Sequence, residues 1–426
     1  MAARRTLERS QWQFPEALLD RQLGELRVFL ERIGRTVPHY RELFEALEFR
    51  PSDLVSLEDL QRLPLLDKAT IRGHFKGLHR EGAKGLMAFN TGGSSGEPLT
   101  FMLGRERVSH DVAAKWRATR WWGVDIGDPE VVLWGSPIEL GAQDRIRQLR
   151  DRLLRTELLS AFEMSADSMD QFLHRIRARR PLMLFGYPSS LALLAKHVVR
   201  TNQRMDDLGI RVAFVTSERL FDYQREAIEQ AFGCPVANGY GGRDAGFIAH
   251  ACPAGSLHVT AEDIVVEVVD GTGRALPLGS TGEIVVTHLR TGDFPFVRYR
   301  TGDLGKLSSD VCDCGRGLPV LASVEGRSTD FLVTRDGTTL HGLAFIYILR
   351  EMAEVEAFRV VQESLELTRV QVVPGDGFDT ASEKTIVEGF RKRLGEEVDV
   401  QVDLCSAIPS EASGKFRYVQ SRVSAP

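Results

Sequence analysis

The chain has 426 residues, 43% of them hydrophobic, and a formal net charge of -5 from 54 basic and 59 acidic residues. A chain of this length exceeds what one hydrophobic core supports, so we expect at least two domains. The small net charge, without a block of Lys or Arg, argues against nucleic-acid binding. No stretch has the apolar length of a signal peptide or a membrane span, so we expect a cytoplasmic protein with no membrane partner.

The predicted elements change in character along the chain. Apolar residues at helical spacing dominate about residues 1–80, where Asp67 is suited to cap a helix that runs toward His74. From about residue 105, short apolar strands alternate with helices. Strands are expected at 131–134, 182–185 and 212–215, and helices up to Trp121 and at 141–155, 165–179, 188–199 and 220–232. Uninterrupted apolar strands between helices indicate a parallel sheet covered on both faces.

The second half of the chain becomes richer in β structure. Strand-like segments at 264–269 and 282–287 predict a β subdomain at about 253–325. Beyond Arg327 the pattern predicts strand, strand, helix, strand, strand, helix and a last strand at 398–404. The predicted fold is therefore α/β: a large N-terminal domain, 1–327, with mostly parallel sheets covered by helices plus the β subdomain, and a small, mobile α+β C-terminal domain, 328–426.

A segment rich in glycine and hydroxyl residues stands between two strand-like runs near residue 90. It contains Thr91, Gly92, Gly93, Ser94, Ser95 and Gly96. Glycines let backbone N–H groups turn toward one point, and the hydroxyls add donors, so the loop is suited to hold a phosphate. It is not a Walker A loop, because Glu97 and Pro98 follow where Lys and Ser or Thr are needed. Taken alone, a hairpin turn without a ligand explains it equally well.

Two further segments follow in a characteristic order. They are Val-Arg-Tyr-Arg-Thr-Gly-Asp-Leu at 297–304 and Pro-Ser-Glu-Ala-Ser-Gly-Lys-Phe-Arg at 409–417. Together with the glycine-rich loop they resemble the three nucleotide and catalytic motifs of the adenylate-forming superfamily of acyl-CoA synthetases, peptide-synthetase adenylation domains and luciferases. From about residue 60 onward the chain is similar to the phenylacetate-CoA ligase subgroup, through segments 63–68, 185–189, 216–220, 240–244, 312–316 and 325–327.

The resemblance implies an AMP-forming acid–thiol ligase that uses ATP, Mg²⁺ and CoA. A small carboxylic acid attacks the α-phosphate of ATP to give an acyl-adenylate and pyrophosphate, and the CoA thiol then takes the acyl group. Transfer to an amine or to a carrier-protein thiol is an alternative. A nucleotide-binding regulatory protein without catalysis is a third reading. The sequence does not identify the acid, although Tyr187, Trp134 and Phe247 are candidates for the pocket wall. Dimers occur in the subgroup, so a homodimer is a further expectation.

The resemblance also implies roles for individual residues. Lys415, in a mobile loop, is the expected catalyst of adenylate formation, because a compact cation there can neutralise charge on the reacting oxygens. Asp303 is expected to accept both ribose hydroxyls. Tyr240 is expected beside adenine, with Gly239 and Gly241 allowing close approach.

The remaining implied roles depart in part from the family pattern. Asp244 stands where the family has a glutamate that meets Mg²⁺. Glu97 adds negative charge beside the expected triphosphate, and Arg327 is favoured over Arg243, Arg298 and Arg300 as the nucleotide contact that offsets it. Asp330 is the expected hinge that moves Lys415 in and out of the site between the two half-reactions.

Four residues around the β subdomain suit a metal ion. Cys252, His258, Cys312 and Cys314 offer two pairs of soft ligands, and four such ligands favour a closed, structural zinc site. His250 is an alternative ligand to His258. Reduced buried thiols or a redox pair are the alternatives to zinc.

Overall fold

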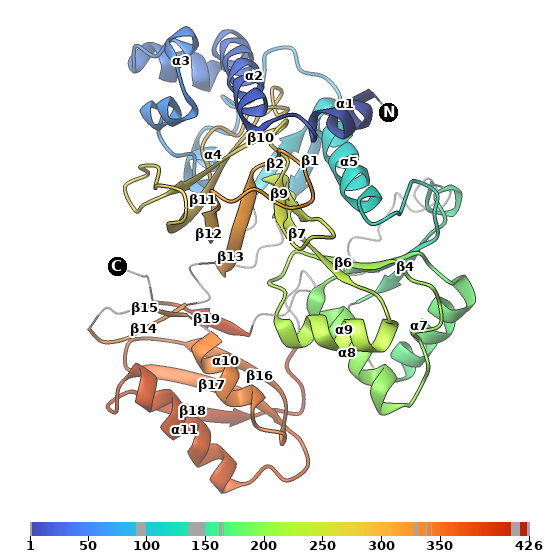
Figure 1. Ribbon diagram of the computed structural model, residues 1–426. Helices are drawn as coiled ribbons and strands as arrows, with labels where there is room; N and C mark the ends of the chain where they lie inside the picture. The colour runs from blue at the N-terminus through green and yellow to red at the C-terminus, as the bar shows by residue number, and fades with distance from the viewer. Residues whose placement is uncertain are drawn as a thin grey trace. The chain divides into compact units, whose positions relative to one another are not determined.

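The computed structural model describes residues 2–90, 99–134, 150–161, 164, 166–327, 331–336, 339–341, 343–409 and 418–423. The chain divides into two compact units, Met1–Glu325 and Gly326–Pro426, and each is described by itself (Figure 1). The boundary expected from the sequence falls two residues later, after Arg327.

The helices of the N-terminal unit begin where the sequence supplies start signals. Pro15 and Pro188 occupy first turns, and the Asp67 carboxylate accepts a hydrogen bond from the backbone N–H of Thr70, which confirms it as a cap. The helices are α1 (Ala2–Ser10), α2 (Pro15–Thr36), α3 (Pro38–Ala46), α4 (Lys68–Gly73), α5 (Arg105–Arg120), α7 (Ala166–Arg179), α8 (Pro188–Arg200) and α9 (Asp222–Phe232), with 3₁₀ turns at Pro51–Asp53 and Leu57–Arg62. The helix expected at 141–155 lies mainly outside the described residues.

The strands of the N-terminal unit form one hairpin and one large sheet. The hairpin pairs β1 (Met87–Asn90) with β2 (Thr100–Leu103) on either side of the glycine-rich loop, which itself lies outside the described residues. The sheet contains β3 (Glu130–Trp134), β4 (Thr156–Ser160), β5 (Met183–Gly186), β6 (Val212–Thr216), β7 (Val236–Gly242), β8 (Gly246–Ala251), β9 (Leu257–Val259), β10 (Ile264–Val269), β11 (Thr281–His288), β12 (Tyr299–Leu307) and β13 (Val320–Arg327).

The large sheet has a parallel half and an antiparallel half. Its order is β10-β11-β12-β13-β9-β8-β7-β6-β5-β3-β4. Strands β4, β3, β5, β6 and β7 pair in parallel, whereas β7–β8, β8–β9, β9–β13, β10–β11 and β11–β12 are antiparallel. The predicted α/β class is confirmed. The strands expected as a β subdomain continue the same sheet.

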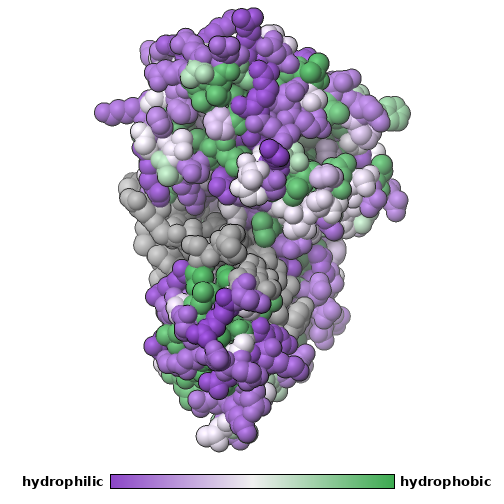
Figure 2. Space-filling model, turned by 90° about the vertical axis from the view of Figure 1, so that its left-hand side faces the viewer, coloured by the Kyte–Doolittle hydropathy of each residue, from purple (hydrophilic) through white to green (hydrophobic). Residues whose placement is uncertain are grey.

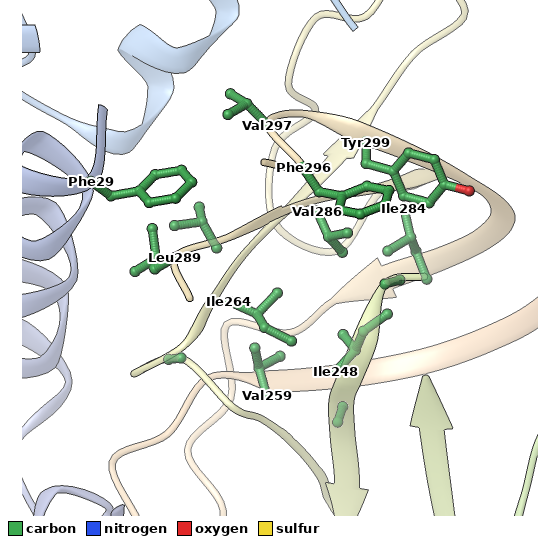
Figure 3. Close-up of a cluster of buried hydrophobic side chains, with 14 of the residues drawn as sticks. Phe29, Ile248, Val259, Ile264, Ile284, Val286, Leu289, Phe296, Val297 and Tyr299 are labelled. Atoms are coloured by element: carbon green, nitrogen blue, oxygen red, sulfur yellow. The ribbon is translucent and has the colours of Figure 1, made fainter. Parts of the chain in front are cut away.

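Apolar side chains point to both faces of the parallel half, as uninterrupted apolar strands require. On β5, Leu184 packs with residues of α7, α8 and α9, and its neighbours Met183 and Phe185 pack into a second cluster on the opposite face. That second cluster extends through the antiparallel half to α2, where Phe29, Leu289, Ile264 and Phe296 gather (Figure 3). The core therefore fixes the strand ends that carry the predicted site.

The C-terminal unit follows the predicted order of elements as far as β18 and adds one strand, β19, that the sequence analysis did not predict. Its elements are β14 (Phe331–Val333), β15 (Thr339–His341), α10 (Leu343–Arg350), β16 (Val355–Gln362), β17 (Leu367–Pro374), α11 (Thr380–Leu394), β18 (Asp399–Leu404) and β19 (Val419–Ser421). The sheet order is β18-β17-β16-β19. Phe345 of α10 and Phe390 of α11 pack with ring centroids 5.0 Å apart.

The visible surface of the units is mainly hydrophilic, with apolar residues in separate patches (Figure 2). Among the described residues, no helix combines the length and apolar character needed to cross a bilayer.

Candidate functional site

Two polar side chains from distant strands meet at one point of the N-terminal unit. The Tyr240 hydroxyl, on β7, donates a hydrogen bond to Asp303 Oδ2, on β12, at 2.9 Å. Three strands separate β7 from β12 in the sheet order. A flat sheet would hold them about 19 Å apart, at four spacings of about 4.8 Å, which exceeds the reach of the two side chains. The contact therefore depends on the curvature of the sheet.

The backbone around Asp303 is held by the residue two positions earlier. The Asp303 N–H donates to Thr301 Oγ1 at 3.1 Å, and the Thr301 hydroxyl donates to the carbonyl of Ile284 at 2.7 Å. Gly302, between them, has φ +75°, a conformation that favours glycine. The Thr-Gly-Asp sequence lies within β12, where the pairing with β11 shifts register between Glu283 and Val285, and this bulge presents the Asp303 carboxylate.

The protonation of Tyr240 suits a hydrogen-bond donor. Burial, and then the neighbouring Asp303 and Asp244 charges, hold the pKa of Tyr240 well above its ordinary value. The hydroxyl therefore stays neutral and donates to the carboxylate over the physiological range. A carboxylate offers about four acceptor positions, so the bond from Tyr240 does not by itself exclude the ribose hydroxyls expected there.

The two glycines beside Tyr240 are required by the protein's own packing. A Cβ atom on Gly239 would lie 2.8 Å from the Phe214 ring, and one on Gly241 would lie 2.1 Å from the carbonyl oxygen of Gly246. Close packing within the protein therefore explains why both positions are glycine, whether or not adenine binds there. Their nucleotide-binding role stays a prediction.

Asp244 lies on the turn between β7 and β8. Its Oδ2 accepts a hydrogen bond from the Tyr299 hydroxyl at 2.7 Å, and its Oδ1 accepts one from the N–H of Ala245 at 3.0 Å. The residue is partly exposed, and both its oxygens keep acceptor capacity beyond these bonds. A single oriented carboxylate of this kind fits Mg²⁺, which binds proteins through one or two carboxylates plus phosphates.

The arginines considered for the phosphates differ in availability. Arg298 is buried in an ion pair with Glu267, with Nη2 and Oε1 3.0 Å apart, and it also donates to two backbone carbonyls. Arg300 pairs with Glu283 at 2.6 Å. Arg298 therefore serves the fold and is unsuited to a phosphate. For Arg327, only the backbone, at the end of β13, is described.

Several predicted site residues fall outside the described part of the chain. They are Thr91, Gly92, Gly93, Ser94, Ser95 and Gly96 of the glycine-rich loop, the hinge residue Asp330 and the catalytic candidate Lys415. Their roles remain predictions from the sequence. Of the residues suggested for an acid pocket, Trp134 and Tyr187 stack with centroids 4.2 Å apart, whereas Phe247 packs in a different cluster with Leu7 and Ala114.

The four predicted metal ligands do converge. One ligand atom from each of Cys252, His258, Cys312 and Cys314 lies within 4.8 Å of all the others. The Cys252 and Cys312 sulfurs are 3.6 Å apart, and Cys314 Sγ lies 3.2 Å from His258 Nε2. Cys252 and His258 are thus brought together with Cys312 and Cys314, which lie 60 and 56 residues further along the chain, respectively, in the loop before β13.

The imidazole of the cluster is oriented for a metal. His258 Nδ1 lies 3.2 Å from the carbonyl oxygen of Leu318, which leaves Nε2 as the nitrogen that faces the sulfurs. Burial lowers the pKa of His258, so the ring is neutral, as a ligand must be. Burial also raises the pKa of the Cys252 thiol to about 11. A bound cation would offset that cost, and the donor set fits zinc.

His250, the alternative ligand, is not part of this cluster. Its ring stacks on Phe247 at 5.5 Å and lies 5.9 Å from the Phe214 ring. Burial lowers its pKa to about 3, so the ring is neutral. The geometry favours His258 as the fourth ligand.

Sequence reasoning missed the groups that support these sites. Tyr299 and Arg107 both reach the Asp244 turn, yet no local spacing links them to it. At the carboxyl end of β6, Ser217 adopts φ +72°, and the adjacent Glu218 accepts a hydrogen bond from the Ser189 N–H at the start of α8 at 3.2 Å. Strained residues often mark functional sites. The sequence signal that could have indicated a functional role for Glu218 was its position at a strand–helix junction, where ligands bind in parallel sheets.

Comparison with known proteins extends over most of the chain. Residues 332–422 match the family model described as the CapK C-terminal domain. Phenylacetate-coenzyme A ligase of Pseudomonas putida is 25% identical over 429 residues, which cover 96% of this chain and 94% of the relative. Protein CapK of Staphylococcus aureus is 22% identical over 380 residues, or 87% of this chain and 82% of the relative.

A similar solved structure has the same fold. It is 2-hydroxyisobutyryl-CoA ligase in the postadenylation state in complex with R3-HIB-AMP, with a TM-score of 0.74 and 22% identity over 94% of this chain and 88% of that one. The motifs in the sequence, the relatives and the fold of this solved structure all point to the same group of proteins.

Proposed function

We propose, on the premise that the chain belongs to the phenylacetate-CoA ligase-like subgroup of the adenylate-forming superfamily, that it activates a small carboxylic acid with ATP and transfers the acyl group to CoA. The observation that carries the proposal is the meeting of Tyr240, Asp303 and Asp244. Two hydrogen bonds join β7 and the turn after it to β12, from Tyr240 to Asp303 and from Tyr299 to Asp244, so the two carboxylates belong to one region. Asp303 can accept hydrogen bonds from the ribose hydroxyls, and Asp244 can bind the cation that accompanies the phosphates, so the pair suits a nucleotide.

In the first half-reaction, a carboxylate oxygen of the substrate attacks the α-phosphorus of ATP, and the bond to pyrophosphate breaks. Asp303 holds the ribose, and Tyr240 keeps that carboxylate in place beside the adenine. Asp244 would hold Mg²⁺, which neutralises phosphate charge when bound. Lys415 supplies the mobile cation that stabilises the charge spreading over the reacting oxygens, with Arg327 as a further phosphate contact.

In the second half-reaction, the CoA sulfur attacks the carbonyl carbon of the acyl-adenylate, its proton is lost to solvent or base, and AMP leaves. Asp330 would serve as the hinge about which the C-terminal unit withdraws Lys415 between the steps. CoA is proposed over an amine or a carrier protein because the phenylacetate and 2-hydroxyisobutyryl relatives are named as coenzyme A ligases.

The cluster of Cys252, His258, Cys312 and Cys314 is proposed to hold a structural Zn²⁺. Four protein ligands leave no open position for a substrate, so the ion would fasten the loop before β13 to β9 and take no part in the reaction.

A direct test measures pyrophosphate release from ATP with a panel of aliphatic and aromatic acids, followed by mass spectrometry of the products formed with CoA, with amines or with a carrier protein. The proposal expects acid-dependent pyrophosphate release and an acyl-CoA product. ATP binding without pyrophosphate release from any acid would support a non-catalytic regulatory protein. An amide or carrier-protein thioester as the sole product would replace CoA as the acceptor.

A further inference from the structure

We propose that Tyr299 and Arg107 are positioning residues that fix the Asp244 carboxylate in the direction in which it meets the nucleotide-bound divalent cation. The inference rests on the proposed function. It adds two residues that contact Asp244, the proposed ligand of the cation, on its carboxylate and on its backbone. It is carried by the contacts of the turn between β7 and β8.

The turn that bears Asp244 is closed tightly on the protein. A Cβ atom on Gly241 would lie 2.1 Å from the Gly246 carbonyl oxygen, so the two ends of the turn almost touch. Gly246 has φ +91°, and a Cβ atom there would lie 2.8 Å from the His288 ring. The turn therefore has little freedom to shift as a body, and the direction of Asp244 depends on what its backbone and carboxylate contact.

Arg107 contacts the backbone of this turn from α5. The side chain is 1% exposed, and Nη2 lies 3.4 Å from the carbonyl oxygen of Arg243 and 3.3 Å from that of Asp244. Nη2 carries two N–H donors in the plane of a rigid guanidinium, so this one nitrogen reaches two successive carbonyls. The contact fixes the peptide planes on both sides of the Asp244 Cα atom.

The Arg107 charge is compensated within the same buried region. Its Nε lies 2.7 Å from Asp111 Oδ2, and Asp111 Oδ1 lies 3.5 Å from His288 Nε2. Burial alone would raise the pKa of Asp111, but the Arg107 charge and His288 hold it below its usual value. Burial lowers the pKa of His288 to about 4, so this ring is neutral. Arg107 is thus held by a charged partner and is available as a rigid support.

Tyr299 contacts the carboxylate itself. Its ring is fully buried and meets the Phe296 ring edge-on, with centroids 5.0 Å apart. Figure 3 shows the ring at the margin of the apolar cluster, with the hydroxyl oxygen directed away from the other side chains. That hydroxyl donates to Asp244 Oδ2 at 2.7 Å, the short distance expected for a bond to an ionised acceptor.

The two supports act on different parts of one residue. Arg107 holds the backbone, and Tyr299 holds one carboxylate oxygen, while the N–H of Ala245 holds the other. An aspartate has a shorter reach than the glutamate of the family, so its direction is set more strictly by these contacts. Supports of this kind typically change metal affinity by 10- to 100-fold when removed.

The test uses the full chain with Mn²⁺ and α,β-methylene-ATP as probes. Free Mn²⁺ is measured by electron paramagnetic resonance, which gives Mn²⁺ affinity without turnover. We expect Tyr299→Phe to weaken Mn²⁺ binding about 10-fold and to raise the half-activating Mg²⁺ concentration in pyrophosphate release by a similar factor. Tyr40→Phe is the matched control, because Tyr40 is also buried and its hydroxyl contacts backbone groups, at Pro295 (3.4 Å) and Val297, and no carboxylate in the described part of the chain. It should change neither value.

Arg107→Lys is the second variant, since it keeps a positive charge and loses the guanidinium that contacts Asp111 through Nε and both carbonyls through Nη2. It should shift Mn²⁺ affinity in the same direction as Tyr299→Phe. Equal Mn²⁺ affinity in wild type and in both variants, in an active enzyme, would overturn the positioning role and leave the proposed function intact. Loss of thermal stability without a change in Mn²⁺ affinity would assign both residues to packing alone. A wild-type protein that neither binds Mn²⁺ with the nucleotide analogue nor releases pyrophosphate would overturn both proposals together.

Discussion

The sulfur–imidazole cluster and the carboxylate site lie in the same unit but are built in different ways. All four ligand atoms of the cluster already converge within 4.8 Å, on strand β9 and two short loops. At the carboxylate site the structure describes Asp303 and Asp244, which we propose as the ribose and cation ligands, while the expected phosphate loop and Lys415 lie outside the described residues. The proposed zinc site has all four ligands in the N-terminal unit, whereas the proposed ligase site also depends on Lys415, a residue of the C-terminal unit.

We therefore expect a substitution in the cluster to lower stability and a substitution in the carboxylate site to lower turnover. Loss of a cluster ligand should lower the stability of the N-terminal unit, because the cluster also anchors the segment after α1. The N–H of Gly317 donates to the Gln11 carbonyl at 3.0 Å, and the Arg316 guanidinium lies 4.8 Å from the Trp12 ring and 4.5 Å from the Trp121 ring.

The largest effect is therefore expected from Cys314→Ser or from chelation of the metal. We expect about one equivalent of zinc in the wild type, less than half in the variant, and a free energy of unfolding lowered on the order of 4 kcal/mol. Elemental analysis and denaturant unfolding provide the measurements. Hydrogen exchange should rise first at residues 11–14 and 312–318. Cys405→Ser, in the C-terminal unit, is the control. Wild-type protein purified without chelators and found nearly free of zinc would contradict the zinc assignment.

The sequence was informative about the cluster because cysteine and histidine are few and chemically distinctive. Four of them at the edges of the β segment sufficed to predict the convergence that the structure shows. The sequence analysis named His258 as the ligand and kept His250 as the alternative, and the packing of His250 against Phe214 and Phe247 excludes it from the cluster.

The fold was predictable for a similar reason. Apolar runs such as Met183–Gly186 and Val212–Thr216 are typical of buried parallel strands, and the elements of the C-terminal unit follow the predicted order as far as β18. The supports of the carboxylate site were not predictable. Arg107 and Tyr299 approach Asp244 from 137 and 55 residues away in sequence, so their contact depends on tertiary packing alone.

The second prediction tests Lys415, the proposed catalytic residue from the C-terminal unit. Lys415→Ala should slow adenylate formation by about 10²-fold or more, comparable to losing one transition-state donor. Thioester formation from supplied acyl-adenylate should stay near the wild-type rate. Both half-reactions are measured separately by rapid quench. Lys392→Ala, an exposed lysine of α11, is the control. Equal damage to both steps would assign Lys415 to general folding or binding.

The third prediction tests Asp303, the proposed ribose ligand on β12. Asp303→Asn keeps the size of the side chain and removes the charge that the ribose hydroxyls and the Tyr240 hydroxyl meet. Hydrogen bonds to charged groups contribute about 1.5–3 kcal/mol, so the KM for ATP should rise about 10- to 100-fold. The pKa of Tyr240 should also fall, because one cause of its elevation is lost. Steady-state kinetics and ultraviolet titration measure the two changes. Asp310→Asn, at an exposed position beyond β12, should have no effect.

The smallest effect is expected from Tyr240→Phe, because two consequences oppose each other. The variant removes the donor that orients Asp303 Oδ2, which disfavours ribose binding, and it also frees that oxygen to accept a ribose hydroxyl. Orientation should win, because a hydrogen bond to a charged group contributes about 1.5–3 kcal/mol, but the Asp303 oxygen that is freed for the ribose should offset part of that loss. We therefore expect a KM for ATP about three- to tenfold higher, with the KM for the acid unchanged. A lower KM for ATP than in the wild type would mean that the hydroxyl competes with the ribose, and Tyr240 would then be a gate on the site instead of its support.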